Sequence, residues 1–406
     1  MSQQHASPET IRLFLRSELP VEEASILIRH LWSRCPQCLR AVGVLAWRSP
    51  QPMLPSYRQA NHRRGYGDAF AAVERRLAIR ERELSWQRDL AADQWQELRR
   101  HPPVRRRWRI RNDPRFGTWG FCERLLHECL ALGRRDPRQA NELAELGVEA
   151  VARLEADRYG AGRVADMEAL AWGTLGEMHR LQLALPAAGE ALARAREAFE
   201  RGTGDSLEEA RLVKIEMALA TDRGELEAAA AALGWVARVY RRSGMEHCEG
   251  LALLFQAKAV GLGDPVKGLT VLDRALQRAD RGQSWVELFG RHHRIWFLDA
   301  AGRSRQAAML LAGSRNLYRP FGDLRTKISL LWLEGRIARS LGDLDAAEAA
   351  FADVRPVLEE RALGFQLSRL TLDLAAVHAA RETSAGTSKC GVTMLSCDRS
   401  VTNEAA

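Results

Sequence analysis

The chain has 406 residues, of which 46% are apolar, 7% aromatic and 28% charged, with a formal net charge of +8. Such a length allows two or three domains with packed cores, and seven cysteines are too few, and odd in number, for a disulfide scaffold. The polar start "MSQQHASPET" does not resemble a signal peptide, and no apolar run approaches the roughly 20 residues of a membrane helix. We therefore expect a cytoplasmic protein with no membrane partner.

Charge and residue usage vary along the chain. Residues 1–118 contain 22 Arg, no Lys and only 12 acidic residues, whereas the remaining residues are nearly neutral. A basic first third indicates an acidic protein partner or nucleic acid. Ala, Leu, Arg and Glu recur throughout, and no strand-like alternation is bounded by hairpin turns. The sequence therefore predicts an all-α fold.

Residues 1–47 are typical of a compact helical module. Ser7 is a candidate N-cap with Pro8 at the first helical position, and Pro20 begins a second helix. That helix carries two acidic residues in its first turn, Glu22 and Glu23, and an apolar stripe of Ala24, Leu27, Ile28 and Leu31. Forty-odd residues rarely bury enough surface to be stable alone, so a bound metal would have a structural role here.

The next segment, residues 48–118, is predicted to contain a linker, a long helix and a basic loop. Three prolines in 48–64 indicate the linker, and an amphipathic helix is expected from about Asp68 to Arg100, ending before the prolines at 102 and 103. Six arginines interleaved with Trp108 and Phe116 then follow in 104–116. Such a run could contact nucleic acid, although it is more often a solvated loop or a cover over a helix-repeat end.

Repeats begin at about Trp119. The glycines at 224, 263, 302 and 342 are separated by 39, 39 and 40 residues, and a helical run follows each of them. Another run begins at Leu185, one period earlier. Periods of this length built from two helices are typical of an α-solenoid.

The residues inside these periods carry a resemblance. Gly335, Gly342, Ala347 and Phe351 have offsets of 0, 7, 12 and 16 within one period, and "WGTLGEMH" at 172–179 places Trp172, Leu175, Gly176 and His179 in a first helix. Both stretches resemble the tetratricopeptide repeat, over about residues 119–381. The resemblance implies a solenoid of helix pairs whose first helices line a peptide-binding groove. The Ser- and Thr-rich residues 382–406 are expected to form a disordered tail.

Cysteine and histidine residues near the N-terminus have the spacing of a metal site. Cys35 and Cys38 form a C-x2-C turn that offers two thiolates, and His30 lies about one helical turn upstream. His5 is the only other His or Cys among the first 29 residues, so it is the candidate fourth ligand. The alternative is that both cysteines are buried apolar side chains and that His5 is a terminal residue. A four-ligand site would be closed, and hence structural.

This pattern resembles the zinc-binding anti-sigma factor domain, a helical module that holds a bacterial sigma factor. The 25-residue separation of His5 and His30 and the "HL" at His30–Leu31 match that family. The resemblance implies zinc as cofactor and a sigma factor or similar regulator as partner. One feature departs: His30 and Cys35 have H-x4-C spacing where the family has H-x3-C, so the helix must end or bulge near residues 33–34 for both to reach one ion.

The tetratricopeptide resemblance further implies that Lys214, His292, Arg336 and Arg339 point into the groove, where they would hold an acidic peptide or carboxylate. The alternative is that each is an ordinary exposed side chain.

No phosphate loop, nucleophile elbow or H-E-x-x-H motif occurs. Cys122, Cys129 and Cys248 lie on apolar-patterned helices, where we expect them to be core residues and not nucleophiles. We therefore expect a non-enzymatic adaptor with structural zinc; the alternative is a nucleic-acid-associated scaffold that uses the basic first third.

Overall fold

The computed structural model describes residues 5–16, 18–32, 35, 37–38, 41–42, 67–133 and 135–397, with the backbone alone at 32, 67–69 and 384–397. Every regular element in these ranges is a helix, which confirms the all-α prediction. None of the helices is long and apolar enough to cross a membrane in the part that the structure describes. The chain forms two compact units: the first holds 1–128, 142–172 and 194–209, and the second 129–141, 173–193 and 210–406.

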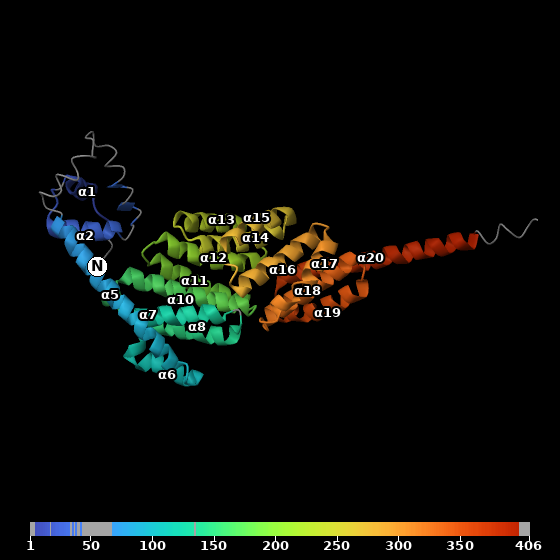
Figure 1. Ribbon diagram of the computed structural model, residues 1–406, viewed down its shortest axis with the longest axis horizontal. Helices are drawn as coiled ribbons and strands as arrows, with labels where there is room; N and C mark the ends of the chain where they lie inside the picture. The colour runs from blue at the N-terminus through green and yellow to red at the C-terminus, as the bar shows by residue number, and fades with distance from the viewer. Residues whose placement is uncertain are drawn as a thin grey trace, which may run out of the picture. The chain divides into compact units, whose positions relative to one another are not determined.

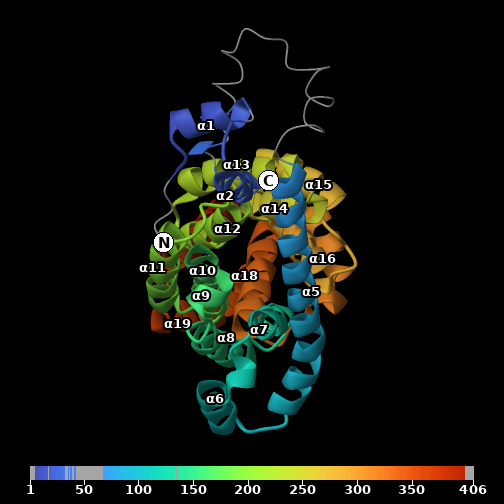
Figure 2. The ribbon, with the colours of Figure 1, turned by 90° about the vertical axis from the view of Figure 1, so that its left-hand side faces the viewer.

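The first unit begins with the small module predicted from the sequence. Helix α1 (Pro8–Leu15) starts at Ser7, whose hydroxyl accepts the backbone N–H of Thr10 at 3.0 Å. Helix α2 (Val21–Trp32) packs its apolar stripe against the start of α5 (Gly67–Leu98). The cluster that joins them contains Leu19, Ala24, Leu27, Ile28 and Val73. The module is therefore supported by the long helix (Figure 2), and the linker expected at 48–64 lies outside the described residues.

The arginine-rich run was expected to be a loop, but the structure shows helix α6 (Pro103–Asn112) followed by a 3-10 turn, η1 (Pro114–Phe116). Proline in the first helical turn and the complete burial of Ile110 and Phe116 favour this arrangement.

The first unit then includes α9 (Ala156–Tyr159). Boundaries between the units fall within α7 (Trp119–Leu132), α8 (Pro137–Val151), α10 (Ala161–Leu181), α11 (Leu185–Glu200) and α12 (Ser206–Arg223).

The second unit is built from successive antiparallel helices, and neighbours such as α13, α14 and α15 lie side by side (Figure 1). The helical runs expected after Gly224, Gly263, Gly302 and Gly342 are all present, as α13, α15, α17 and α19. The complete set after α12 is α13 (Leu226–Arg242), α14 (Glu246–Gly261), α15 (Pro265–Arg278), α16 (Ser284–Ala300), α17 (Ser304–Ala312), η2 (Arg315–Tyr318), α18 (Leu324–Leu341), α19 (Leu344–Glu360) and α20 (Gly364–Cys397).

Small residues allow the helices of a pair to approach closely. A Cβ atom at Gly335 would lie 2.6 Å from the ring of Phe351, which is fully buried. Gly176 is packed in the same way, because a Cβ atom there would lie 2.8 Å from the side chain of Leu192. Gly342 ends α18 with a φ of 88°, a conformation that glycine adopts without steric cost. The residues behind the repeat-like pattern therefore pack the helices against each other.

Contacts between helices far apart in sequence distinguish the second unit from a simple solenoid, in which each repeat touches only its neighbours. Arg325 of α18 donates to the backbone carbonyl of Arg180 in α10 at 2.9 Å. Gln366 of α20 donates to the carbonyl of Asp222 in α12 at 2.7 Å. The backbone of α20 also remains helical to Cys397, beyond the boundary expected at residue 381.

Candidate functional site

The four predicted metal ligands come together in the first unit. Ligand atoms of His5, His30, Cys35 and Cys38 all lie within 4.8 Å of one another, so this cluster could hold a metal ion. His5 precedes α1, His30 lies in the last turn of α2, and the two cysteines follow α2. Three separate backbone segments would thus be joined at one point.

The distances within the cluster fit a tetrahedral ion. His5 Nδ1 lies 3.3 Å from Cys35 Sγ and 3.9 Å from Cys38 Sγ. In a tetrahedral zinc site with ordinary bond lengths, nitrogen and sulfur ligands are about 3.6 Å apart. The rings of His5 and His30 meet edge to face, with centroids 5.7 Å apart. The donor atoms therefore need only small adjustments to coordinate one ion.

The H-x4-C spacing is accommodated because α2 ends at Trp32 and Cys35 lies outside any helix. His30 and Cys35 therefore need not share one face of an ideal helix. Burial raises the pKa of the Cys38 thiol, although a hydrogen bond from the Ala6 backbone opposes this shift. Burial, followed by the charge of His5, lowers the pKa of His30 and favours its neutral, metal-binding form.

Most arginines of the basic run are engaged with carboxylates of the first unit. Arg107 Nη2 lies 2.7 Å from Glu145, and Arg109 Nη2 lies 2.6 Å from Glu97. Trp108 is 61% exposed, whereas Phe116 is completely buried. The other pairs are Arg106–Glu142, Arg107–Glu149, Arg111–Glu149 and Arg115–Asp113. These contacts reduce the positive charge available to a phosphate backbone.

A second candidate site lies entirely within the second unit, and His292 is the one predicted groove residue that lines it. It is a cavity of about 210 Å³, here named the aromatic cavity. Its walls come mainly from alternate helices, namely α10, α12, α14, α16, α18 and α20. Eight of the chain's 27 Trp, Tyr and Phe side chains line it: Phe255, Trp285, Phe289, Trp296, Tyr318, Phe321, Trp332 and Phe365.

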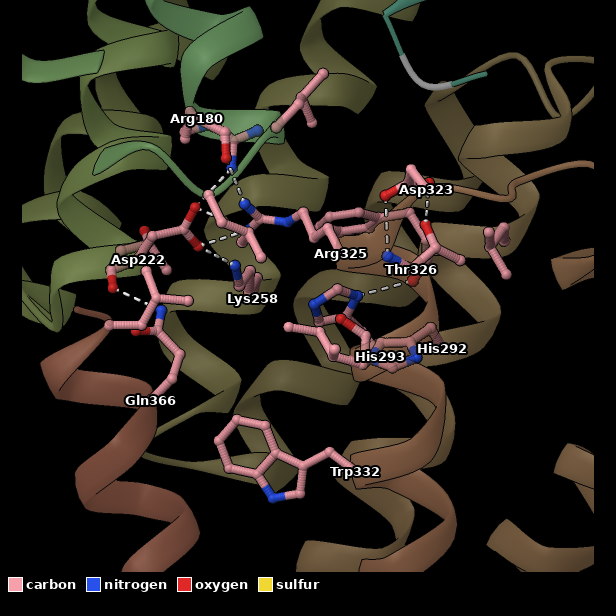
Figure 3. A pocket seen from close by; sticks show the side chains of 18 of the residues that line it. Arg180, Asp222, Lys258, His292, His293, Asp323, Arg325, Thr326, Trp332 and Gln366 are labelled. Atoms are coloured by element: carbon pink, nitrogen blue, oxygen red, sulfur yellow. Dashed lines mark hydrogen bonds and ion pairs between the residues drawn. The ribbon is translucent and has the colours of Figure 1, made fainter. Parts of the chain in front are cut away.

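One side of the aromatic cavity holds a buried charge cluster around Asp222 (Figure 3). Lys258 Nζ lies 2.6 Å from Asp222 Oδ1, and Arg180 Nη1 lies 2.7 Å from Oδ2. Arg325 Nη2 contacts both carboxylate oxygens, at 2.9 and 2.8 Å. Arg180 is also paired with Glu177 through two hydrogen bonds of 2.7 and 2.8 Å. Three cations from three helices thus share one carboxylate.

These neighbours shift the pKa values of the cluster. Burial alone would raise the pKa of Asp222, but Arg325, Lys258 and Arg180 hold it well below its usual range. Burial lowers the pKa of Lys258 to about 8 despite the opposing effect of Asp222. Burial would also lower the pKa of Arg180, yet Glu177 and Asp222 raise it above the ordinary arginine value. The cluster is therefore ionised near neutral pH, with Lys258 as its most easily deprotonated cation.

Two adjacent histidines form another part of the wall. His292 Nδ1 lies 3.0 Å from the Tyr318 hydroxyl, and His293 Nδ1 donates to the Phe289 carbonyl at 2.9 Å. Burial, with a smaller effect of Lys258, lowers the pKa of His292 to about 4. Burial and the neighbouring His292 lower the pKa of His293 well below its ordinary value. Both imidazoles are therefore neutral at pH 7.

The groove residues expected from the repeat resemblance have different surroundings. His292 lines the aromatic cavity, whereas Lys214, Arg336 and Arg339 are not among its lining residues. Arg336 and Arg339 pair with Asp373, at 3.0 and 2.6 Å. Arg336 also lies over the ring of Trp296, 4.5 Å from its centroid. Both arginines therefore join α18 to α20 through a buried carboxylate.

Three further cysteines were expected to be core residues. Cys122 and Cys129 are fully buried, and burial raises the pKa of each thiol, to about 12 for Cys129. Cys248 is partly exposed.

No protein-family model matches the chain, and no curated protein is significantly similar to it. Sequence reasoning missed Arg180, Asp222, Lys258 and Arg325 because they lie on four different helices and form no short motif. The only signal for this cluster in the sequence was that charged residues occur within apolar-patterned helices.

Proposed function

We propose that the chain is a non-enzymatic protein-interaction adaptor whose N-terminal module is held together by one zinc ion. The convergence of His5, His30, Cys35 and Cys38 within 4.8 Å carries this proposal. Two nitrogen and two thiolate ligands suit zinc, and a four-ligand protein site leaves no open position for a substrate. The ion would link the segment before α1, which carries His5, to the end of α2. It would thereby stabilise a module whose core is too small to be stable alone.

Exposed apolar side chains in the first unit support a protein partner. Ile26 of α2 is 59% exposed, and Ile79 and Trp86 of α5 are 63% and 59% exposed. The last two are seven residues apart and thus lie on one face of the helix. Solvent-exposed tryptophan and isoleucine of this kind are typical anchors of protein interfaces. Following the resemblance to anti-sigma domains, we propose a sigma factor or related regulator as the partner.

A nucleic-acid scaffold is the less favoured function. Arginines 106, 107, 109, 111 and 115 of the basic run pair with carboxylates of the same unit. A phosphate backbone would have to compete for these side chains, and counterion release would be correspondingly small.

The helix-pair features at Gly335–Phe351 and Trp172–His179 also fit a tetratricopeptide-like scaffold for docking proteins.

Zinc content of the purified full-length chain tests the metal part of the proposal. We expect one zinc ion per chain by elemental analysis, and loss of that zinc in Cys38→Ser and His30→Ala. Cys248→Ser is the matched control, because Cys248 lies on α14 in the second unit and should leave zinc content unchanged. Metal-free wild-type protein whose α1–α2 module remains protected from proteolysis would refute a structural ion.

Titration with purified sigma factors from the same organism tests the partner. We expect one of them to bind the zinc-loaded chain, with affinity lost on chelation and weakened by Trp86→Ala. Exposed Leu372 on α20 provides the control Leu372→Ala, which removes an apolar side chain outside the first unit. Zinc-loaded protein that binds none of these factors would refute the partner and leave the metal site in place.

A further inference from the structure

We propose that the aromatic cavity binds an aromatic carboxylate: a flat ring joined by a short arm to a carboxylate group. The cavity lies wholly in the second unit, apart from the proposed zinc module. It juxtaposes an aromatic-rich wall with a cationic one, so that it matches both ends of such a molecule.

The cationic wall has the polarity needed for an anion. The side chains of Lys258 and Arg325 are 18% and 21% exposed, whereas the Asp222 side chain behind them is only 1% exposed. All three residues line the cavity, and the two cations are more accessible than the carboxylate that they share. Glu177 pairs with Arg180, and the lining then holds three further cations, Lys258, Arg325 and Arg369, against two carboxylates, Asp222 and Asp323. This local excess of positive charge favours a bound anion, because uncompensated buried charge is costly.

Hydrogen-bond donors remain for that anion. Among the described residues, Lys258 Nζ has one polar contact, with Asp222, so that two of its three N–H groups lack a protein acceptor. Arg325 uses Nη1 for the Arg180 carbonyl and Nη2 for Asp222, and its Nε–H has no acceptor within the described residues. A ligand carboxylate could thus accept from both side chains while Asp222 stays in place.

The aromatic wall has a polar group without a partner in the described part of the chain. Trp296 is 7% exposed and lines the cavity, yet its indole Nε1–H is buried without a hydrogen-bond acceptor. Because this N–H group is buried from the cavity as well as from solvent, a ligand would contact the ring of Trp296 and not its N–H group. Arg369 lies over the Trp296 ring, 5.5 Å from its centroid, and adds a further cation to the lining.

The size of the cavity limits the ligand. An apolar cavity of about 150 Å³ holds benzene, and one water-sized group takes roughly 30 Å³ of liquid volume. A cavity of about 210 Å³ therefore has room for one ring and a short acidic arm. Aromatic side chains such as Phe255, Phe289 and Trp285 would stack on or meet the edge of that ring. A free aromatic acid and the C-terminal aromatic residue of a peptide share this chemistry.

Calorimetric titration of the full chain with phenylacetate and indole-3-acetate tests the proposal. We expect saturable binding at one site per chain. The neutral phenylacetamide should bind roughly tenfold or more weakly, since a charge-assisted hydrogen bond is lost. Acetate, which lacks the ring, should show no saturable binding. A tripeptide ending in a free phenylalanine carboxylate distinguishes the sources: tighter binding than phenylacetate identifies a peptide terminus, and weaker binding identifies a free acid.

Substitutions locate the site. Lys258→Met should weaken phenylacetate binding roughly tenfold, and Asp222 keeps two cationic partners in this variant. Arg294→Met is the matched control, because Arg294 also pairs with an aspartate, Asp273, but does not line the cavity. Thermal unfolding of each variant verifies its fold. Equal affinities for phenylacetate and phenylacetamide, or no binding of either arylacetate to the folded wild-type chain, would overturn the proposal.

Discussion

Replacing Asp222 by Asn should destabilise the second unit strongly. The substitution preserves shape but removes the one carboxylate that contacts Arg180, Lys258 and Arg325 at 2.6–2.9 Å. Arg180 keeps its pair with Glu177, whereas Lys258 and Arg325 lose their counterion. Breaking a buried ion pair by removing one partner costs about 3–5 kcal/mol. Because Asp222 is 2% exposed, solvent cannot replace the lost charge, and we expect a loss in this range.

Denaturant unfolding followed by circular dichroism measures this loss. Asp273→Asn is the control, since Asp273 pairs with Arg294 but its side chain is 55% exposed. Its removal should cost below about 1 kcal/mol, as for other surface pairs. Adding Lys258→Met to Asp222→Asn should recover part of the stability, because one uncompensated cation is then absent. If Asp222→Asn costs no more than Asp273→Asn, the carboxylate does not organise the cluster.

Acid should destabilise the second unit, because the pKa of His292 is lowered from 6.5 to about 4 in the folded chain. The contribution of His292 to the unfolding free energy is complete above pH 6.5 and falls by roughly 3 kcal/mol as the pH drops to 4. Unfolding free energies at pH 7.5 and 4.5 should differ less in His292→Gln than in wild type; an unchanged difference would contradict this pKa. Phe351→Ala should cost about 3–5 kcal/mol in denaturant unfolding, since Phe351 is fully buried. Gly335→Leu should also destabilise, by about 1–3 kcal/mol or more, because its Cβ meets the Phe351 ring at 2.6 Å. A neutral result for either would show that this helix pair packs loosely.

The two sites differ in what they require of the chain. The metal ligands are at most 33 positions apart, from His5 to Cys38. The Asp222 cluster joins residues up to 145 positions apart, from Arg180 to Arg325. The first site involves only residues at and near α1 and α2, whereas the second exists only when α18 and α20 pack near α10 and α12.

Local features were readable from the amino-acid sequence because they depend on neighbouring residues. The Ser7 cap, the apolar stripe of α2, the end of α5 before Pro102 and the helices after the spaced glycines all occur as predicted. Each depends on side-chain periodicity or on backbone preferences within a few positions. The same local spacing identified the four residues that gather at the candidate metal centre.

Only the tertiary structure decided which charges meet. Periodicity shows which face of a helix is apolar, but it does not show which distant helix that face contacts. The sequence places Arg336 and Arg339 in a predicted groove, but it does not indicate that both pair with Asp373 of α20. The sequence likewise does not show that arginines of α6 pair with glutamates of α8 and are therefore less available to nucleic acid. The aromatic cavity has the same origin, because its lining is assembled from helices separated by long stretches of chain.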